Sequence, residues 1–245
     1  MPDPFAQAGY LPLPELSPYV RHDRFEQPKE VFKFIANTLA RRTDSNHAYH
    51  MADIGCANGE LLYYLRQRFA HWRFQGYDLT PEFIAAGRAY PPMAGIALEV
   101  GDLFALTGTF DIVSFINVMT VMDGAEEPLL KLLSLVNPGG LLLVDGIFNV
   151  DDIELRAVFM DNSRPESRGI WRREYSQFSR CSIAAILADR CRSFDFEEIP
   201  MNVDIPRRPE APAINVWTFR DERGRRILTN GTHMMLEKTL LTVQV

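Results

Sequence analysis

The sequence predicts an α/β fold in which a doubly wound, mostly parallel sheet carries helices on both faces. Apolar runs and helical patterns alternate along residues 28–150, as they do in repeated strand–helix units. Two of the runs, "IVSFINVM" and "LLLV", are continuously apolar, which is typical of strands buried on both faces of a parallel sheet. The stretch "DIGCANG" then joins the first run to a helix through small residues, as a ligand-binding turn would.

The elements follow one another regularly along the chain. A first helix is expected at 28–42, where apolar residues recur at helical spacing behind Pro28. Thr80 is the expected N-cap of a later helix, with Pro81 at its first position. Strands are expected at 48–55, 72–79, 96–102, 110–119 and 141–148, helices at 59–70, 81–90 and 125–136, and a turn at 137–140.

The two ends of the chain depart from this alternation. Residues 1–27 are dotted with proline and are expected to form an arm or lid, while 28–245 form a single domain. The polar, poorly periodic stretch at about 150–180 is expected to be a cap insertion, followed by a helix at 182–191. The remainder, 194–245, is rich in strand formers, and the turn "DERG" predicts an antiparallel C-terminal hairpin.

Composition excludes several classes of protein. The hydrophobic content of 47% and charged content of 24% are those of an ordinary globular protein, and no apolar run is long enough to span a bilayer. The net charge of −6 argues against a nucleic-acid partner. The N-terminus lacks the pattern of a signal peptide and the three scattered cysteines fit no zinc spacing, so we expect a cytoplasmic protein with reduced thiols.

Small residues and acids point to one ligand site. Gly55, Ala57 and Gly59 fall at relative positions 0, 2 and 4, whereas a dinucleotide fingerprint needs 0, 2 and 5. The spacing offers backbone N–H groups beside a helix N-terminus, and Asp53 just before it would attract an amino group and repel a pyrophosphate. Asp78 ends the next strand, where doubly wound folds place an acid that binds ribose hydroxyls.

Asp102 ends the third strand and could meet an adenine amino group, with Leu103 and Phe104 beside the ring. Because parallel strands end at one edge of the sheet, Asp53, Asp78 and Asp102 should share one crevice. Each residue also has a purely structural interpretation. The glycines could be turn glycines, Asp78 a helix-start acid and Asp102 a turn former.

The chain resembles the class I S-adenosylmethionine-dependent methyltransferases of the small-molecule type. The resemblance covers roughly residues 28–150 and rests on "DIGCANG", "GYDLTPEF", "EVGDLF", "FDIVSFINVM" and "VNPGGLLLV". It implies the Rossmann-like methyltransferase fold with a seven-stranded sheet, and S-adenosylmethionine as cofactor. The cofactor-binding residues that it implies are Asp53, Gly55, Cys56, Ala57, Gly59, Asp78, Leu79, Asp102, Leu103 and Asn117.

Three of these residues need comment. Ala57 stands where the family usually has Gly, and its Cβ would oppose only a strongly positive φ. For Asn117 two interpretations stand equally: a role facing the ligand, and local hydrogen bonding. Cys56 is expected to fill space rather than to react.

The sequence indicates the catalytic residues less clearly than it indicates the cofactor site. An in-line methyl transfer depends mainly on positioning, but a hydroxyl or amine acceptor also needs a base. The weak candidates for that base are His22, Tyr175 and His233. Asp145 and Asn149 lie where a metal-dependent variant of the fold has ligands, but without a third oxygen ligand we expect no metal.

An excess of arginine in the cap predicts the acceptor's charge. Residues 164–180 hold five Arg against two Glu, and Arg forks suit carboxylate or phosphate. We therefore expect a small anionic acceptor, methylated on O or N, that contacts Arg172, Arg173 and Tyr175. In the rival interpretation these arginines pair with Glu166, Glu174 and the acids at 151–154.

Two other functions stay open. One is a nucleotide- or nicotinamide-dependent enzyme on the same fold, and the other is a non-catalytic cofactor-binding or interaction protein. Cofactor titration separates the first from a methyltransferase, and formation of S-adenosylhomocysteine excludes the second.

Overall fold

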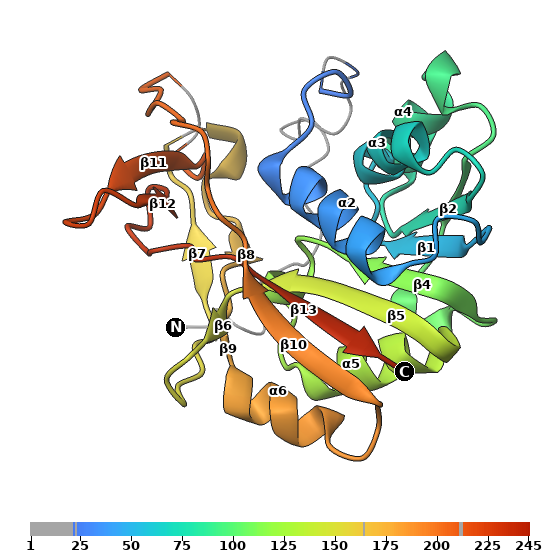
Figure 1. Ribbon diagram of the computed structural model, residues 1–245. Coiled ribbons are helices and arrows are strands. Elements are labelled where there is room, and N and C mark those ends of the chain that lie inside the picture. Colours follow the sequence, from blue (N-terminus) through green and yellow to red (C-terminus); the bar gives the residue numbers. More distant parts are fainter. Residues whose placement is uncertain (1–21, 23, 164, 211–212) are drawn as a thin grey trace.

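A seven-stranded sheet forms the centre of the protein, as the computed structural model shows for the residues that it describes, 22, 24–163, 165–210 and 213–245 (Figure 1). The strand order is β10-β13-β5-β4-β1-β2-β3. Neighbours from β5 to β3 pair in parallel, whereas β13 is antiparallel to both β5 and β10. The strands are β1 His50–Ile54, β2 Arg73–Asp78, β3 Ala97–Val100, β4 Phe110–Phe115, β5 Val136–Gly146, β10 Ser193–Glu198 and β13 Thr239–Gln244. The predicted fold class is confirmed.

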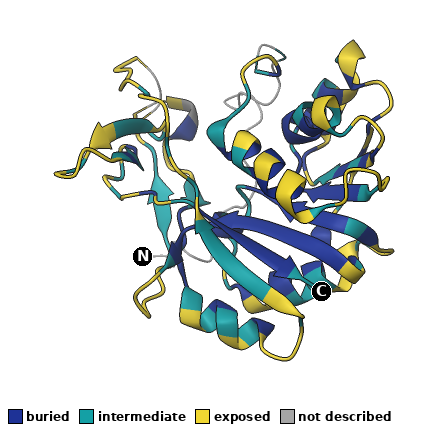
Figure 2. Cartoon of the chain, viewed as in Figure 1, coloured by how far each residue is buried: buried dark blue, intermediate teal, exposed yellow. Residues whose placement is uncertain are grey.

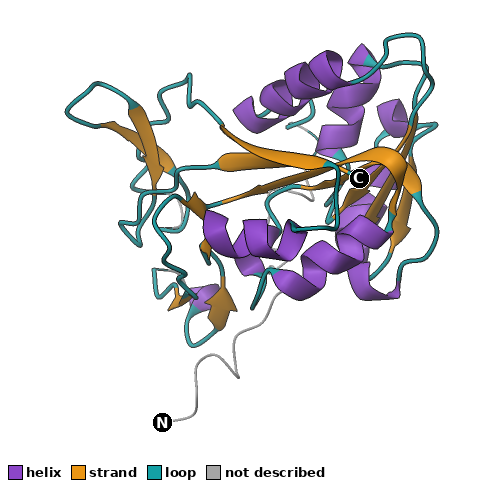
Figure 3. Cartoon of the chain, turned by 60° about the horizontal axis from the view of Figure 1, so that its bottom comes forward, coloured by secondary structure: helices purple, strands orange, loops and turns teal. Residues whose placement is uncertain are grey.

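Helices cover both faces of this sheet (Figure 3). They are α2 Glu30–Arg42, α3 Glu60–Arg68, α4 Pro81–Arg88, α5 Glu126–Ser134 and α6 Arg180–Leu187. Successive side chains of a strand point to opposite faces, so Ile112 of β4 packs into the core under α2 and α3 while Val113 packs into the core under α5 and α6. The continuous apolar strands therefore reflect two hydrophobic layers, and Figure 2 shows the central strands as buried.

Several boundaries differ from expectation. The strand expected at 110–119 ends at Phe115, because Asn117 takes a left-handed φ of 61° and a short 3₁₀ helix, Met119–Val121, follows. The expected turn at 137–140 lies within β5. Thr80 is at the N-cap position of α4, but its hydroxyl makes no capping hydrogen bond.

Two excursions from the sheet, residues 147–179 and 199–238, form a unit that we call the cap. The first contains β6 Phe148–Asn149, β7 Val158–Met160, β8 Trp171–Arg173 and β9 Phe178–Ser179, and the second contains β11 Trp217–Arg220 and β12 Arg226–Thr229. The β11–β12 pair is the predicted antiparallel hairpin, and it lies outside the main sheet. Buried Ile147, Tyr175 and Leu236 form an apolar cluster that joins the two excursions.

The structure does not test the predicted division of the chain into an arm at 1–27 and a single domain at 28–245. Residues 1–21 and 23, most of the expected arm, lie outside the described residues. The division into one domain with a cap insertion at about 150–180 stays a prediction. Among the described helices, none has the length and apolar character that crossing a bilayer requires.

Candidate active site

The loop between β1 and α3 is built on three left-handed residues. Gly55, Ala57 and Gly59 have φ values of 74°, 51° and 87°. The N–H groups of Gly55 and Cys56 donate to the Tyr77 carbonyl at 2.7 and 2.9 Å, which fixes the loop to the end of β2. A Cβ at Gly55 or Gly59 would also collide with the protein's own side chains, so the glycines serve packing as well as conformation.

Asp78, the last residue of β2, holds the loop from the other side. Its Oδ2 accepts a hydrogen bond from Ala57 N at 2.8 Å, and its Oδ1 accepts one from Thr80 N at 2.8 Å. Burial raises the pKa of this carboxyl, and the two N–H donors oppose that rise. Each oxygen still has accepting capacity, which suits a pair of ligand hydroxyls.

Asp53 lies deeper than the sequence suggests. It is only 3% exposed, and its Oδ1 accepts a hydrogen bond from Ser114 Oγ of β4 at 2.6 Å. Burial raises the pKa of Asp53 to about 7, and the nearby Asp78 carboxylate adds to the rise. Asp53 lines a small cavity of about 30 Å³ with Lys29 and Asn117. Sequence reasoning missed Ser114, although a lone Ser in the apolar run next to β1 was a usable signal.

The third strand ends at Val100, so Asp102 lies two residues beyond it rather than at its end, and it caps a short 3₁₀ turn. Its Oδ1 accepts from Phe104 N at 3.0 Å. Beside it, Leu79 and Phe104 are 49% and 44% exposed, while Leu103 is buried. These exposed apolar side chains at the carboxyl edge of the sheet could cover a flat ring.

A polar cluster closes the site at the ends of β4 and β5. Asn117 N donates to Oδ1 of the fully buried Asp145, and Lys238 Nζ donates to Asn117 Oδ1. Lys238 Nζ also lies 3.1 Å from Asp145 Oδ2. Asn117 therefore makes the local hydrogen bonds that were one of its two interpretations. Lys238 was missed, since nothing in its sequence neighbourhood marks it.

One cleft of about 2630 Å³ collects most of these residues. Of the predicted cofactor residues, Gly55, Ala57, Asp78, Leu79, Asp102, Leu103 and Asn117 line it. Asp53, Cys56 and Gly59 are not among the described residues that line this cleft, and Asp53 and Cys56 line the small cavity instead. Burial raises the pKa of the Cys56 thiol well above its usual value, which fits an inert, space-filling residue.

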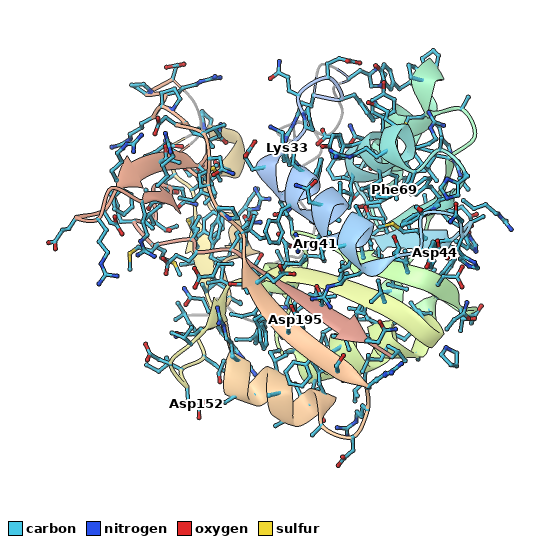
Figure 4. The ribbon with its side chains drawn as sticks, in the orientation of Figure 1. Lys33, Arg41, Asp44, Phe69, Asp152 and Asp195 are labelled. Atoms are coloured by element: carbon cyan, nitrogen blue, oxygen red, sulfur yellow. The ribbon has the colours of Figure 1, made fainter. Side chains whose placement is uncertain are left out.

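Helix α2 and the cap form two walls of the cleft, and Figure 1 shows them on either side of the strand ends. The C-terminal part of α2 is tied to β10 by ion pairs from Arg41 to Glu197 at 2.8 Å and from Arg42 to Asp195 at 2.6 Å. Figure 4 labels Arg41 and Asp195 of these pairs. The cleft exceeds the roughly 300–1,000 Å³ that one drug-sized ligand fills, so it has room for two.

The three candidate bases are placed differently. His22 Nε2 lies 2.7 Å from the Ala86 carbonyl, and His233 packs edge-on to Trp217. Neither belongs to the described residues that line the cleft. Tyr175 does line it, but burial raises the pKa of its hydroxyl, which makes the phenolate harder to form.

The two candidate arginines of the cap, Arg172 and Arg173, differ in their ion pairing. Arg173 Nη1 forms an ion pair with Asp123 Oδ2 at 2.7 Å. Arg172 lines the cleft and forms no ion pair with any described residue. Glu174, counted above only as a partner for arginines, also lines the cleft. Burial raises the pKa of its carboxyl, and the charges of Arg172 and Lys238 oppose the rise.

The residues at the positions where a metal-dependent variant of the fold has its ligands make other contacts here. Asp145 is paired with Lys238, and Asn149 Oδ1 accepts from Asp151 N. In the described part of the chain, no three His, Cys, Asp or Glu residues gather as metal ligands would.

The site can now be compared with known proteins. Residues 52–142 match a family described as "Methyltransferase domain". A trans-aconitate 2-methyltransferase of Deinococcus radiodurans is 26% identical over 129 residues, which are 53% of this chain. The match spans about half of that relative's length.

Solved structures share the fold at low identity. A chain of the complex between the Haloferax volcanii Trm112 methyltransferase activator and a "putative methyltransferase" has a TM-score of 0.59 at 18% identity, covering 92% of this chain and 95% of that one. Magnesium protoporphyrin IX methyltransferase of Synechocystis PCC 6803, with S-adenosylhomocysteine bound, has a TM-score of 0.52 at 15% identity, covering 88% and 83%. At such identities these likenesses describe the fold alone.

Proposed function

Because the chain carries a class I S-adenosylmethionine-dependent methyltransferase domain, we propose that it transfers the cofactor's methyl group to a small molecule. The observation that carries the proposal is the convergence of the 55–59 loop, Asp78 and Asp102 on one cleft at the carboxyl edge of the sheet. When bound, the cofactor supplies a methyl group on a sulfonium, which is an excellent leaving group.

The chain's own residues suit the parts of that cofactor. Asp78 has accepting capacity left for the ribose hydroxyls, and Leu79 and Phe104 are exposed where an adenine ring would lie beside Asp102. The methionine end would then reach toward Asn117 and the buried Asp53. Lys29 at the start of α2 lines both this region and the cleft, and its charge would favour a carboxylate there.

We propose further that the acceptor is small and anionic and that it is methylated on O or N. The size of the cleft supports a second ligand beside the cofactor. Arg172 supports an anionic one, since it faces the cleft without an ion pair to a described residue. A relative that is named for the tricarboxylate trans-aconitate supports only the negative charge of the acceptor, because that compound has no hydroxyl or amino group. Arg173, paired with Asp123, is the weaker candidate contact.

Calorimetry with S-adenosylhomocysteine tests the cofactor site. Asp78→Ala removes two charge-assisted hydrogen bonds to the ribose, so affinity should fall about 30- to 1000-fold, equivalent to about 2 to 4 kcal/mol. Because Asp78 also holds Ala57 N and Thr80 N, Asp78→Asn, which keeps one accepting oxygen, is measured alongside it. Glu82→Gln, on the exposed first turn of α4, is the control for loss of a charge. Unchanged affinity in both Asp78 variants would contradict the assigned site.

A further inference from the structure

Glu174 is held in place over the loop that follows β4. Two contacts flank it in sequence: Arg173 forms its 2.7 Å ion pair with Asp123, and Ser176 N donates to the Thr120 carbonyl at 2.9 Å. Both partners lie in the segment just beyond the end of β4. The backbone on both sides of Glu174 is thus attached to the segment 120–123, although Glu174 belongs to the cap.

The residues next to Glu174 restrict its orientation further. Tyr175 takes a left-handed φ of 66°, which a bulky residue adopts only where its surroundings impose it, and such strain is typical of functional sites. The positive charge of Lys238, which donates a hydrogen bond to Asn117, also acts on Glu174. Glu174 and Asn117 therefore share a cationic neighbour at the end of β4.

The Glu174 carboxylate has charged neighbours but no direct partner. Arg172 of β8 and Lys238, which precedes β13, bring positive charge near it, and the Tyr175 hydroxyl is also close. Yet no described residue forms a hydrogen bond or ion pair with the carboxylate, and Lys238 donates instead to Asn117 and Asp145. The carboxylate is partly buried and lines the cleft, where a bound ligand can donate to it.

We propose that Glu174 is the proton acceptor of the methyl transfer, and that the group methylated is therefore a hydroxyl or an amine. This inference rests on the proposed function. The carboxylate would accept a hydrogen bond from the acceptor's O–H or N–H, and the cations nearby would hold an anionic group elsewhere on the same molecule. Burial that raises the pKa of Glu174 brings it closer to that of an effective base at neutral pH.

The step balances in atoms and charge. The acceptor oxygen or nitrogen forms a bond to the methyl carbon as the carbon–sulfur bond breaks, and the proton on that oxygen or nitrogen moves to Glu174. The positive sulfonium becomes a neutral thioether, the negative carboxylate becomes a neutral acid, and the methylated group is neutral. A carboxylate acceptor has no proton to give, so ester formation would leave Glu174 without a role and would set two negative charges together.

Matched acceptors test the proposal. The full chain with S-adenosylmethionine is assayed for S-adenosylhomocysteine and product mass with 4-hydroxybenzoate and benzoate, lactate and propanoate, and glycine and acetate. Turnover should be confined to the hydroxyl or amino member of a pair. For that member Glu174→Gln should lower kcat at least about 100-fold and remove the rise of kcat/KM with pH, and Glu174→Asp should restore part of the rate. Affinity for S-adenosylhomocysteine should not change, and Glu82→Gln should behave as wild type.

Two results would overturn the proposal. One is methylation of benzoate, propanoate or acetate, and the other is a Glu174→Gln variant that keeps its kcat and pH profile. A readout without turnover is the ¹³C titration of the Glu174 carboxyl, which should have a higher midpoint in the folded protein than in the denatured chain. An equal midpoint would also overturn the proposal. A wild-type chain that binds neither S-adenosylmethionine nor S-adenosylhomocysteine would instead contradict the proposed function.

Discussion

In the loop between β1 and α3, Ala57 is a residue whose backbone conformation has a steric cost. Its φ of 51° is left-handed, and a Cβ costs about 1 to 2 kcal/mol in that conformation. Ala57→Gly relieves this cost but adds about 0.5 to 1 kcal/mol of entropy to the unfolded chain. We expect the free energy of unfolding to rise by up to about 1 kcal/mol, and Ala57→Val to lower it, in urea denaturation. A less stable Gly variant would show that the loop is not left-handed at this position.

Some residues of the site could be located from the sequence and others could not, for a physical reason. Asp78 is the last residue of β2 and Asp102 lies two residues beyond β3, so the strand pattern predicts the edge of the sheet at which both lie. Lys238 acts on Asn117 across 121 residues of sequence, and no local pattern encodes that contact. Glu174 was visible only as one acid among arginines, because its isolation from donors is a property of the folded cap.

At the scale of elements, helix α4 packs against the loop between β1 and α3. A Cβ at Gly87 of α4 would collide with the Asn58 carbonyl, a backbone atom that cannot rotate away. Gly87→Ala gains about 1 kcal/mol of helix propensity, but overpacking costs about 1 to 3 kcal/mol. We expect a net loss of unfolding free energy and weaker binding of S-adenosylhomocysteine, measured by denaturation and calorimetry.

Gly124→Ala is the matched control for Gly87→Ala. A Cβ at Gly124 meets nothing within 4 Å among the described residues, so the substitution should leave the unfolding free energy nearly unchanged. Equal effects of the two substitutions would mean that α4 does not press on the loop.

Elements were predicted best where the pattern is local. Alternating strands and helices up to β5 followed from periodicity and turn residues, and the hairpin β11–β12 followed from its turn. The insertion of β13 between β5 and β10 did not, because strand order depends on pairing between distant segments. The short strands of the cap are stabilised by packing between its two excursions, which a single polar stretch does not reveal.

At the scale of the whole molecule, Asp53 makes stability depend on pH. Its pKa is raised from 3.8 to about 7 by burial, so between these values the folded protein binds a proton that the unfolded chain has lost. The stabilising contribution is complete below pH 3.8 and is lost as pH rises through about 7. The raised pKa values of Asp78 and Glu174 act in the same direction.

Asp53→Asn should flatten that dependence. Denaturation at pH 5 and pH 8 should show a smaller loss of unfolding free energy in the variant than in the wild type, by at most about 3 kcal/mol, because about two pH units lie between pH 5 and the raised pKa. Parallel pH profiles would contradict a protonated Asp53 in the folded protein.

The position of β13 has a consequence for biosynthesis. As the chain leaves the ribosome, β10 appears well before β13, because residues 199–238 lie between them. In the finished sheet β10 lies at the edge and pairs with β13, so until β13 arrives the backbone donors and acceptors of β10 have no strand to pair with. Unpaired strand edges on nascent chains promote aggregation. During the interval between the synthesis of β10 and that of β13, the unpaired backbone of β10 is therefore exposed to pairing with another chain.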